Sequence, residues 1–233
     1  MFKVNTKEPV DVIGHTQSAY AGRARGYSPE PVRDAAWELA GRKASGTVLD
    51  IGSGEGGWIK RLKLNSGIQH VISTDIIDDG ASHIEGVRFY QLDVSSAALP
   101  CADNTVDWVF ALEVIEHLTN PRHFVMEAYR SLTVGGTLFI STPCVDSLTA
   151  RLSFLFRGYF PAFCEHDYRV SGHITPLSEI DLQRIALESG FRQVKFYYPL
   201  PGRIPRTDIH WQKIVPWLQG KLWSDTLFAM LVK

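Results

Sequence analysis

The stretch that decides the fold is Val48-Leu49-Asp50-Ile51-Gly52-Ser53-Gly54-Glu55-Gly56-Gly57. Its first part, within the run Thr47 to Ile51, is short, apolar and bounded by glycines, which is typical of a buried strand. The glycines that follow predict a tight turn whose backbone N–H groups approach a ligand closely, and a helical pattern through Trp58 and Leu62 comes next. The stretch therefore predicts a strand, a ligand-binding turn and a helix, although it does not show which ligand binds. A P-loop is disfavoured because no Walker lysine follows the turn.

The rest of the chain repeats this alternation of strands and helices. Further strands are predicted over residues 70–75, 87–92, 106–112, 137–141, 191–198 and 226–232. Helices are predicted to begin near Pro31, after Asn120 as the cap of Pro121, and after Ser178 with Asp181 completing a capping box. Apolar strands that alternate with helices indicate an α/β fold with a mostly parallel, doubly wound sheet and helices on both faces.

Acidic residues close the first three predicted strands. Asp75 follows Asp50 by 25 residues, and a carboxylate at that place can accept two hydrogen bonds from ribose hydroxyls. Asp93 ends the third strand, within reach of a nucleobase amine. A nicotinamide dinucleotide is the less favoured ligand, because Asp50 and Glu55 would stand beside its pyrophosphate. Any one of these acids alone also fits a helix cap or a turn.

Five segments together resemble the class I S-adenosylmethionine-dependent methyltransferases of types 11 and 23. They are DIGSGEGG (50–57), TDI (74–76), LDV (92–94), ALEVIEHL (111–118) and GGTLFISTP (135–143). The resemblance implies a Rossmann-like seven-stranded sheet of order 3-2-1-4-5-7-6 with the last strand antiparallel. It also implies S-adenosylmethionine as cofactor and S-adenosylhomocysteine as product. The cofactor contacts it implies are Asp50, Gly52, Gly54, Asp75, Ile76, Asp93, Val94, Leu112 and Glu113.

The segment after the fourth strand carries side chains that could bind a metal ion or act as a general base. Glu113, Glu116 and His117 are spaced so that one helical turn would align them, and such a set suits Mg²⁺, Mn²⁺ or Zn²⁺. The segment is similar to the metal-binding segments of the ubiquinone-biosynthesis O-methyltransferases and the small-RNA 3′-end 2′-O-methyltransferases. That resemblance implies a metal ligand at His166, with His173 as the other candidate. Without a metal, His117, His166 and His173 are the candidate general bases, and each also fits a packed or solvated histidine.

Two insertions interrupt a single predicted domain over residues 31–233, which follows an irregular lead-in over residues 1–30. Residues 144–176 are long and aromatic, and three interpretations compete for them: a lid over the acceptor, an element that contacts lipid, or ordinary core or dimer packing. Residues 199–223 are rich in tryptophan. The basic and aromatic residues of the tail from Lys195 to Lys233 fit single-stranded RNA, a membrane surface, or a packed helix with solvated lysines. In the lead-in, Tyr20 and Arg25 are candidate cofactor contacts.

Composition excludes several classes of protein. The chain has 24 basic and 25 acidic side chains, which argues against a duplex-DNA binder, and 45% hydrophobic residues suffice for a sizeable core. The three cysteines form no CxxC pair, so a disulfide framework is not expected. The polar N-terminal residues do not resemble a secretory signal, and no run of about 18 apolar residues predicts a membrane span. A cytoplasmic protein is expected, peripheral membrane contact remains open, and the oligomeric state is undetermined.

The function expected from these observations is O-methylation of a hydroxyl on a small molecule, such as a saccharide or a quinone or lipid precursor. One alternative is an RNA 2′-O-methyltransferase, which the same acidic and histidine residues and the basic tail would suit. The other is a non-catalytic module that binds the cofactor. The intact glycine turn and Asp75 argue against that module.

Overall fold

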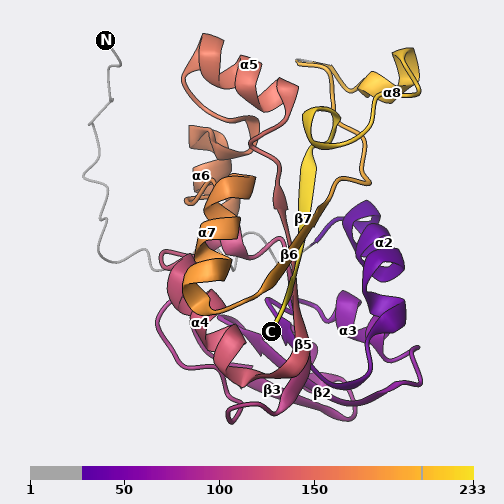
Figure 1. Ribbon diagram of the computed structural model, residues 1–233, viewed down its shortest axis with the longest axis vertical. Helices are drawn as coiled ribbons and strands as arrows, with labels where there is room; N and C mark the ends of the chain where they lie inside the picture. Colours follow the sequence, from indigo (N-terminus) through magenta and orange to yellow (C-terminus); the bar gives the residue numbers. More distant parts are fainter. Residues whose placement is uncertain (1–27, 206) are drawn as a thin grey trace.

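A computed structural model describes residues 28–205 and 207–233 of the chain (Figure 1). One seven-stranded sheet has the order β3-β2-β1-β4-β5-β7-β6. The strands are β1 (Gly46–Ile51), β2 (Ile68–Asp75), β3 (Val87–Gln91), β4 (Val106–Leu112), β5 (Leu132–Pro143), β6 (Gln193–Tyr197) and β7 (Thr226–Val232). Strands β1 to β5 pair in parallel, whereas β7 is antiparallel to both β5 and β6. The predicted strand order and the antiparallel last strand are confirmed.

Helices pack on both faces of the sheet, as predicted (Figure 1). They are α2 (Glu30–Leu39), α3 (Gly57–Leu62), α4 (Pro121–Ser131), α5 (Leu148–Arg157), α6 (Glu165–Ser171), α7 (Glu179–Ser189) and α8 (Trp211–Ile214). Short 3₁₀ turns are η1 (Gly41–Lys43), η2 (Ala81–His83), η3 (Ile115–His117), η4 (Pro161–Phe163) and η5 (Lys221–Trp223). Two predicted helix starts are confirmed: the Asn120 side chain accepts the His123 N–H, and Ser178 forms a capping box with Asp181.

The central strands are buried on both faces, which is why their sequences are continuous apolar runs. Alternate residues of β1 enter different cores: Val48 packs with the side of α2 and α3, and Leu49 with the side of α4 and α7. Phe110 is fully buried in the first of these cores, with its ring 5.3 Å from that of Trp58. Trp58 therefore belongs to the core beneath the glycine turn.

Strand β5 begins earlier than the sequence predicts. Its pairing with β4 starts at Leu132, directly after α4, and the register shifts before Thr137. Gly135, with φ 84°, and Gly136 therefore lie inside an irregular strand rather than in a turn ahead of it. Local sequence marks the bend at the glycines, but the pairing that extends the strand comes from the tertiary contact with Val106.

The two insertions fold against each other at one end of the molecule (Figure 1). Residues 144–176 contain α5, η4 and α6, and residues 199–223 contain α8 and η5. The Trp211 Nε1–H donates to the Thr149 hydroxyl at 3.2 Å, and that hydroxyl donates to the Arg203 carbonyl. Of the described residues, none belongs to a helix long and apolar enough to cross a membrane. Tyr20 and Arg25 lie outside the described residues.

Candidate active site

The glycine turn lies between β1 and α3 and is tied to the end of β2. Gly52 has φ 72° and Gly54 has φ 48°, a region of backbone conformation that favours glycine. A Cβ atom at Gly52 would lie 2.5 Å from Val114 Cγ2, so a side chain there would clash. The Gly52 N–H donates to the Thr74 carbonyl at 2.8 Å, and the Gly54 N–H donates to Asp75 Oδ2 at 2.8 Å. These contacts fix the turn against the carboxyl ends of two strands.

The acids predicted to hold a nucleoside follow the second and third strands. Asp75 Oδ1 accepts the Ile77 N–H at 3.2 Å, so backbone donors orient both oxygens of this carboxylate. Asp93 Oδ1 accepts the Ser95 N–H at 2.8 Å, which is the contact of a turn residue. Ile76 is partly buried next to Asp75, as expected for a residue that packs on a ligand. The parallel pairing of β1, β2 and β3 brings these residues to one edge of the sheet.

Asp50, in β1, lies at this same edge of the sheet, and its carboxylate is buried. It is 2% exposed, and within residues 28–205 and 207–233 its Oδ2 atom has no hydrogen-bond partner. Burial raises the pKa of Asp50 well above its ordinary value, and the neighbouring Asp75 raises it further. A buried carboxylate without a counter-charge is costly, and a cationic group of a ligand would remove that cost. The site is therefore chemically suited to a ligand that carries an ammonium group.

Glu113 departs from the helical turn that the sequence predicts. Its φ is 56°, and the 3₁₀ turn η3 covers only Ile115–His117, so the expectation that one helical turn aligns Glu113, Glu116 and His117 is wrong. Glu113 is instead held by β5, because its carboxylate accepts the Ser141 hydroxyl at 2.7 Å and its N–H donates to Ser141 Oγ at 3.0 Å. A positive φ at a residue other than glycine is uncommon and marks a constrained position.

A cluster of three side chains forms at the end of β4. One ligand atom each from Glu116, His117 and His173 lie within 4.8 Å of one another, and the two imidazole rings are 4.7 Å apart. Glu116 is fully buried near Thr142, and among the described residues neither of its carboxylate oxygens has a hydrogen bond within ordinary distance and angle limits. Burial raises the pKa of Glu116 well above its ordinary value, and Glu113 adds to the shift. We call Glu116, His117 and His173 the histidine cluster.

His173, rather than His166, lies beside the segment after β4. The backbone N–H groups of Ile174 and Thr175 both donate to the Glu116 carbonyl, at 3.0 and 2.9 Å. His166 lies exposed on α6 and does not belong to the cluster. The sequence marks both histidines as candidates, but it cannot show that the chain after α6 returns to η3. Sequence analysis also missed Ser141, whose role depends on the pairing of β4 with β5.

Both histidines of the cluster are neutral at pH 7. Burial, and then the neighbouring His173, lower the pKa of His117 to about 4, and burial also lowers the pKa of His173. The His173 Nδ1–H donates to the Ala162 carbonyl at 2.7 Å, and the His117 Nδ1–H donates to the Gly172 carbonyl at 3.3 Å. Since a carbonyl only accepts, the basic lone pair of the neutral His173 ring is on Nε2, whereas the His117 ring also interacts with the carbonyls of Ser171 and Glu113. Such rings are able to accept a proton or to coordinate a metal ion.

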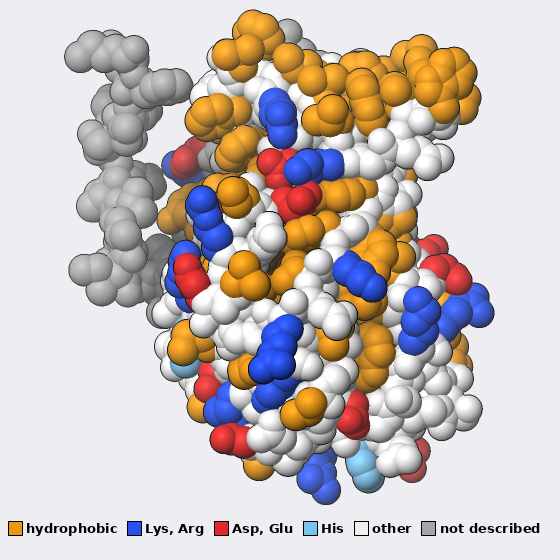
Figure 2. All heavy atoms as spheres, in the orientation of Figure 1, with side chains coloured by type: hydrophobic (Ala, Val, Ile, Leu, Met, Phe, Trp, Pro, Cys, Tyr) orange, Lys and Arg blue, Asp and Glu red, His pale blue; other side chains and the backbone are white. Residues whose placement is uncertain are grey.

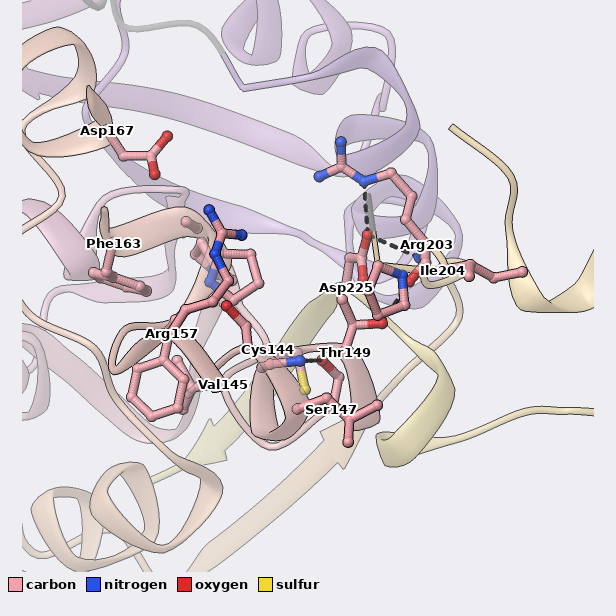
Figure 3. Close-up of a pocket in the computed structure, with 18 of the residues that line it drawn as sticks. Cys144, Val145, Ser147, Thr149, Arg157, Phe163, Asp167, Arg203, Ile204 and Asp225 are labelled. Atoms are coloured by element: carbon pink, nitrogen blue, oxygen red, sulfur yellow. Dashed lines mark hydrogen bonds and ion pairs between the residues drawn. The ribbon is translucent and has the colours of Figure 1, made fainter. Parts of the chain in front are cut away.

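A cavity of about 980 Å³ lies between the two insertions (Figure 3). Arg157, Phe163 and Asp167 line one side, and the ion pair of Arg203 with Asp225 lies on the other side. Its floor reaches the carboxyl end of β5 through Pro143, Cys144 and Val145. His173 lies against its wall, because His173 bonds Ala162 and its ring is 5.6 Å from that of Phe163. The cavity is large enough for a small organic molecule.

Comparisons with known proteins support the class of protein that the sequence resembles. A family described as a methyltransferase domain matches residues 23–195. A probable S-adenosylmethionine-dependent methyltransferase of Mycolicibacterium smegmatis is 35% identical over 108 residues, which are 45% of this chain and 41% of that protein. A similarly described protein of Mycobacterium tuberculosis is 34% identical over 108 residues, 45% of this chain and 38% of its own length. The match thus spans about two fifths of each curated relative.

Solved structures extend the comparison to the whole fold. A S-adenosylmethionine-dependent methyltransferase from Archaeoglobus fulgidus superposes with a TM-score of 0.64 at 20% identity, covering 93% of this chain and 99% of that one. At that identity the likeness shows the fold alone. The matched family covers most of the chain and includes the glycine turn, Asp75 and the segment after β4. The chain belongs to the methyltransferase-domain family of the class I, S-adenosylmethionine-dependent type.

Proposed function

We propose that this chain transfers a methyl group from S-adenosylmethionine to a hydroxyl of a small molecule held in the cavity of Figure 3. The observation that carries the proposal is the histidine cluster, which contains two neutral imidazoles at the end of β4 and touches the cavity wall through Ala162. A hydroxyl must lose its proton on methylation, and a neutral imidazole is suited to receive it. Acceptors of this class include a saccharide and a quinone or lipid precursor.

The edge formed by β1, β2 and β3 suits S-adenosylmethionine. Asp50, with its unpartnered oxygen, would face the amino group, and Asp75 would hold the ribose hydroxyls. Asp93 and Ile76 would lie at the adenine. Glycine is needed at position 52 because a Cβ atom there would clash with Val114. When bound, the cofactor supplies an electrophilic methyl group, so the protein's own work is to position the acceptor and take its proton.

His173 is the better candidate base of the two clustered rings. A general base works best when its pKa lies near the working pH, and the pKa of His117 is lowered to about 4. His173 is less buried than His117 and packs behind the cavity wall, against Ala162 and Phe163. Its Nδ1–H bond to Ala162 fixes the ring and leaves Nε2 as the proton acceptor. We assign His117 and Glu116 to positioning this ring.

The same cluster has the donor set of a divalent metal site, which is the second candidate chemistry. Neutral imidazole Nε2 atoms and a carboxylate are ordinary ligands of Zn²⁺ or Mn²⁺, and Glu116 offers two oxygens without hydrogen bonds. A bound cation would polarise the acceptor hydroxyl and lower its pKa. Glu113 would stand next to such a site rather than in it, because Ser141 holds its carboxylate.

A radiolabel assay tests both the acceptor class and the metal. Tritium from methyl-labelled S-adenosylmethionine is followed into organic, aqueous small-molecule, RNA and protein fractions of an extract from the source organism. We expect label in one of the two small-molecule fractions, undiminished after the enzyme is treated with a chelator. Label confined to RNA would contradict a small-molecule acceptor. Activity lost with chelator and restored by Mn²⁺ or Zn²⁺, but not in Glu116→Gln, would instead make the cluster a metal site.

The raised pKa of Asp50 predicts how cofactor binding depends on pH. A cationic amino group binds the carboxylate form, so Asp50 must lose its proton when the ligand binds. We expect the affinity for S-adenosylhomocysteine to rise with pH above the ordinary aspartate pKa of about 3.9, with proton release detected by calorimetry in two buffers. Asp50→Asn should bind more weakly at pH 7 and lose this pH dependence. Asp78→Asn, an exposed change on the next loop, is the matched control and should keep it.

A further inference from the structure

Large apolar side chains are exposed at the end of the molecule where the two insertions meet (Figure 2). Helix α5 contributes Phe154, Leu155 and Phe156, the last two more than 70% exposed. The tryptophan-rich segment contributes Ile214, Trp217 and Leu222, of which Trp217 is 79% exposed. We call these six side chains the apolar end. An exposed apolar patch drawn from two segments that contact each other indicates an interaction surface.

The charge around the apolar end is one-sided. Residues 148–163 and 209–223 contain Arg151, Arg157, Lys213 and Lys221 but no aspartate or glutamate. Since the whole chain has a net charge of −1, the remainder carries an excess of five acidic groups. Arg151 forms an ion pair with Asp146 and Lys221 with Glu179 of α7, whereas no carboxylate in the described part of the chain pairs with Arg157 or Lys213. The segments that form the apolar end therefore carry a net positive charge, whereas the rest of the chain has a net negative charge.

The cavity and the apolar end share residues of α5. Phe156 belongs to the apolar end, and both Phe156 and Arg157 line the cavity. The opposite wall comes from residues 203–205, 207 and 208, in the same insertion as Trp217. The lining between the mouth and Cys144 at the end of β5 is mostly apolar, with Arg157 and Arg203 as its cations and Asp167, Asp208 and Asp225 as its acids.

We propose that the apolar end docks on an anionic lipid surface and presents the mouth of the cavity to it. Apolar side chains with cationic neighbours are the combination that binds at the interface of such a bilayer. A second copy of this chain fits less well, because a two-fold contact would bring Arg157 and Lys213 against like charges. The docking proposal does not depend on the proposed methyl transfer. Only its consequence, that the acceptor is an amphiphile taken from the lipid surface, rests on the proposed function.

Vesicle sedimentation of the full chain tests the docking. We expect the protein to bind vesicles of phosphatidylcholine with roughly a third phosphatidylglycerol about tenfold more tightly than phosphatidylcholine alone, with binding that weakens as salt is added. The double variant Leu155→Ser, Trp217→Ser should lose the binding to anionic vesicles, and Lys213→Gln should weaken it. Leu64→Ser, Val134→Ser and Arg42→Gln change side chains of similar exposure elsewhere and should bind as the wild type does.

Three results would overturn the proposal. The wild type binds neither kind of vesicle, the Leu64→Ser, Val134→Ser control loses as much vesicle binding as the Leu155→Ser, Trp217→Ser variant, or the latter variant binds anionic vesicles as the wild type does. Light scattering supplies a fourth test. If the wild type is a dimer and only the Leu155→Ser, Trp217→Ser variant is a monomer, the apolar end is an interface between two copies of the chain. Calorimetry with S-adenosylhomocysteine separates this failure from failure of the proposed function. All of these variants should bind that ligand unchanged, because none lies at the edge of β1 to β3.

Discussion

Replacement of Asp75 by alanine should lower the affinity for S-adenosylhomocysteine by at least about 100-fold, the largest effect on binding expected from one side chain. Two hydrogen bonds from ribose hydroxyls to a carboxylate are worth about 1.5–3 kcal/mol each, and about 2.7 kcal/mol corresponds to 100-fold. The loss also has a second source. Asp75 Oδ2 holds the Gly54 N–H at 2.8 Å, so the variant frees the turn that the cofactor must contact. Isothermal titration calorimetry measures the change.

The stability of this variant should change little, so lost binding will not reflect lost folding. Burial raises the pKa of Asp75, which means that the folded state binds a proton more tightly than the unfolded state. Above its ordinary pKa the ionised carboxylate therefore costs stability, and its removal offsets the loss of the Gly54 contact. Asp78→Ala, on the exposed loop that follows, is the matched control and should bind normally. Unchanged affinity in a folded Asp75→Ala protein would contradict the ribose role.

Most of the fold was predictable because local sequence and tertiary structure agree. The strand bounds predicted at 106–112 and 226–232 match β4 and β7, since each is a continuous apolar run that lies buried on both faces. The strand order itself was implied by the resemblance that the glycine turn and Asp75 carry. The start of β5 was not predictable, because it depends on how Leu132 pairs with a neighbouring strand rather than on its own neighbours in sequence.

The candidate site was predictable in its residue types but not in its geometry. Sequence spacing placed Glu113 on a helical turn, yet Ser141 of another strand holds that carboxylate and the backbone adopts φ 56°. The sequence resemblance likewise favoured His166 as the metal ligand, whereas the structure places His173 in the cluster. The choice depends on the N–H groups of residues 174 and 175, which bind the Glu116 carbonyl and return the chain to η3. Contacts that close long loops are the information that local patterns lack.

His173→Ala should lower kcat by at least about 100-fold while the affinity for S-adenosylhomocysteine stays unchanged. The variant removes the proton acceptor but leaves the edge of β1 to β3 intact, so the effect should appear in kcat rather than in cofactor binding. His166→Ala, an exposed change on α6, is the control and should retain full activity. His117→Ala should have a smaller effect, because His117 contacts the ring of His173 and acts through its position.

The pH profile of kcat separates a base from a structural histidine. Because burial lowers the pKa of His173, its ring stays unprotonated below the ordinary histidine pKa of about 6.5, and activity should fall only at more acidic pH. His173→Ala should remove that acidic limb and regain activity when free imidazole is added. A variant that loses activity but keeps the limb, without rescue, would mean that His173 only holds the loop between α6 and α7 against Glu116. The proton would then leave the acceptor by another route.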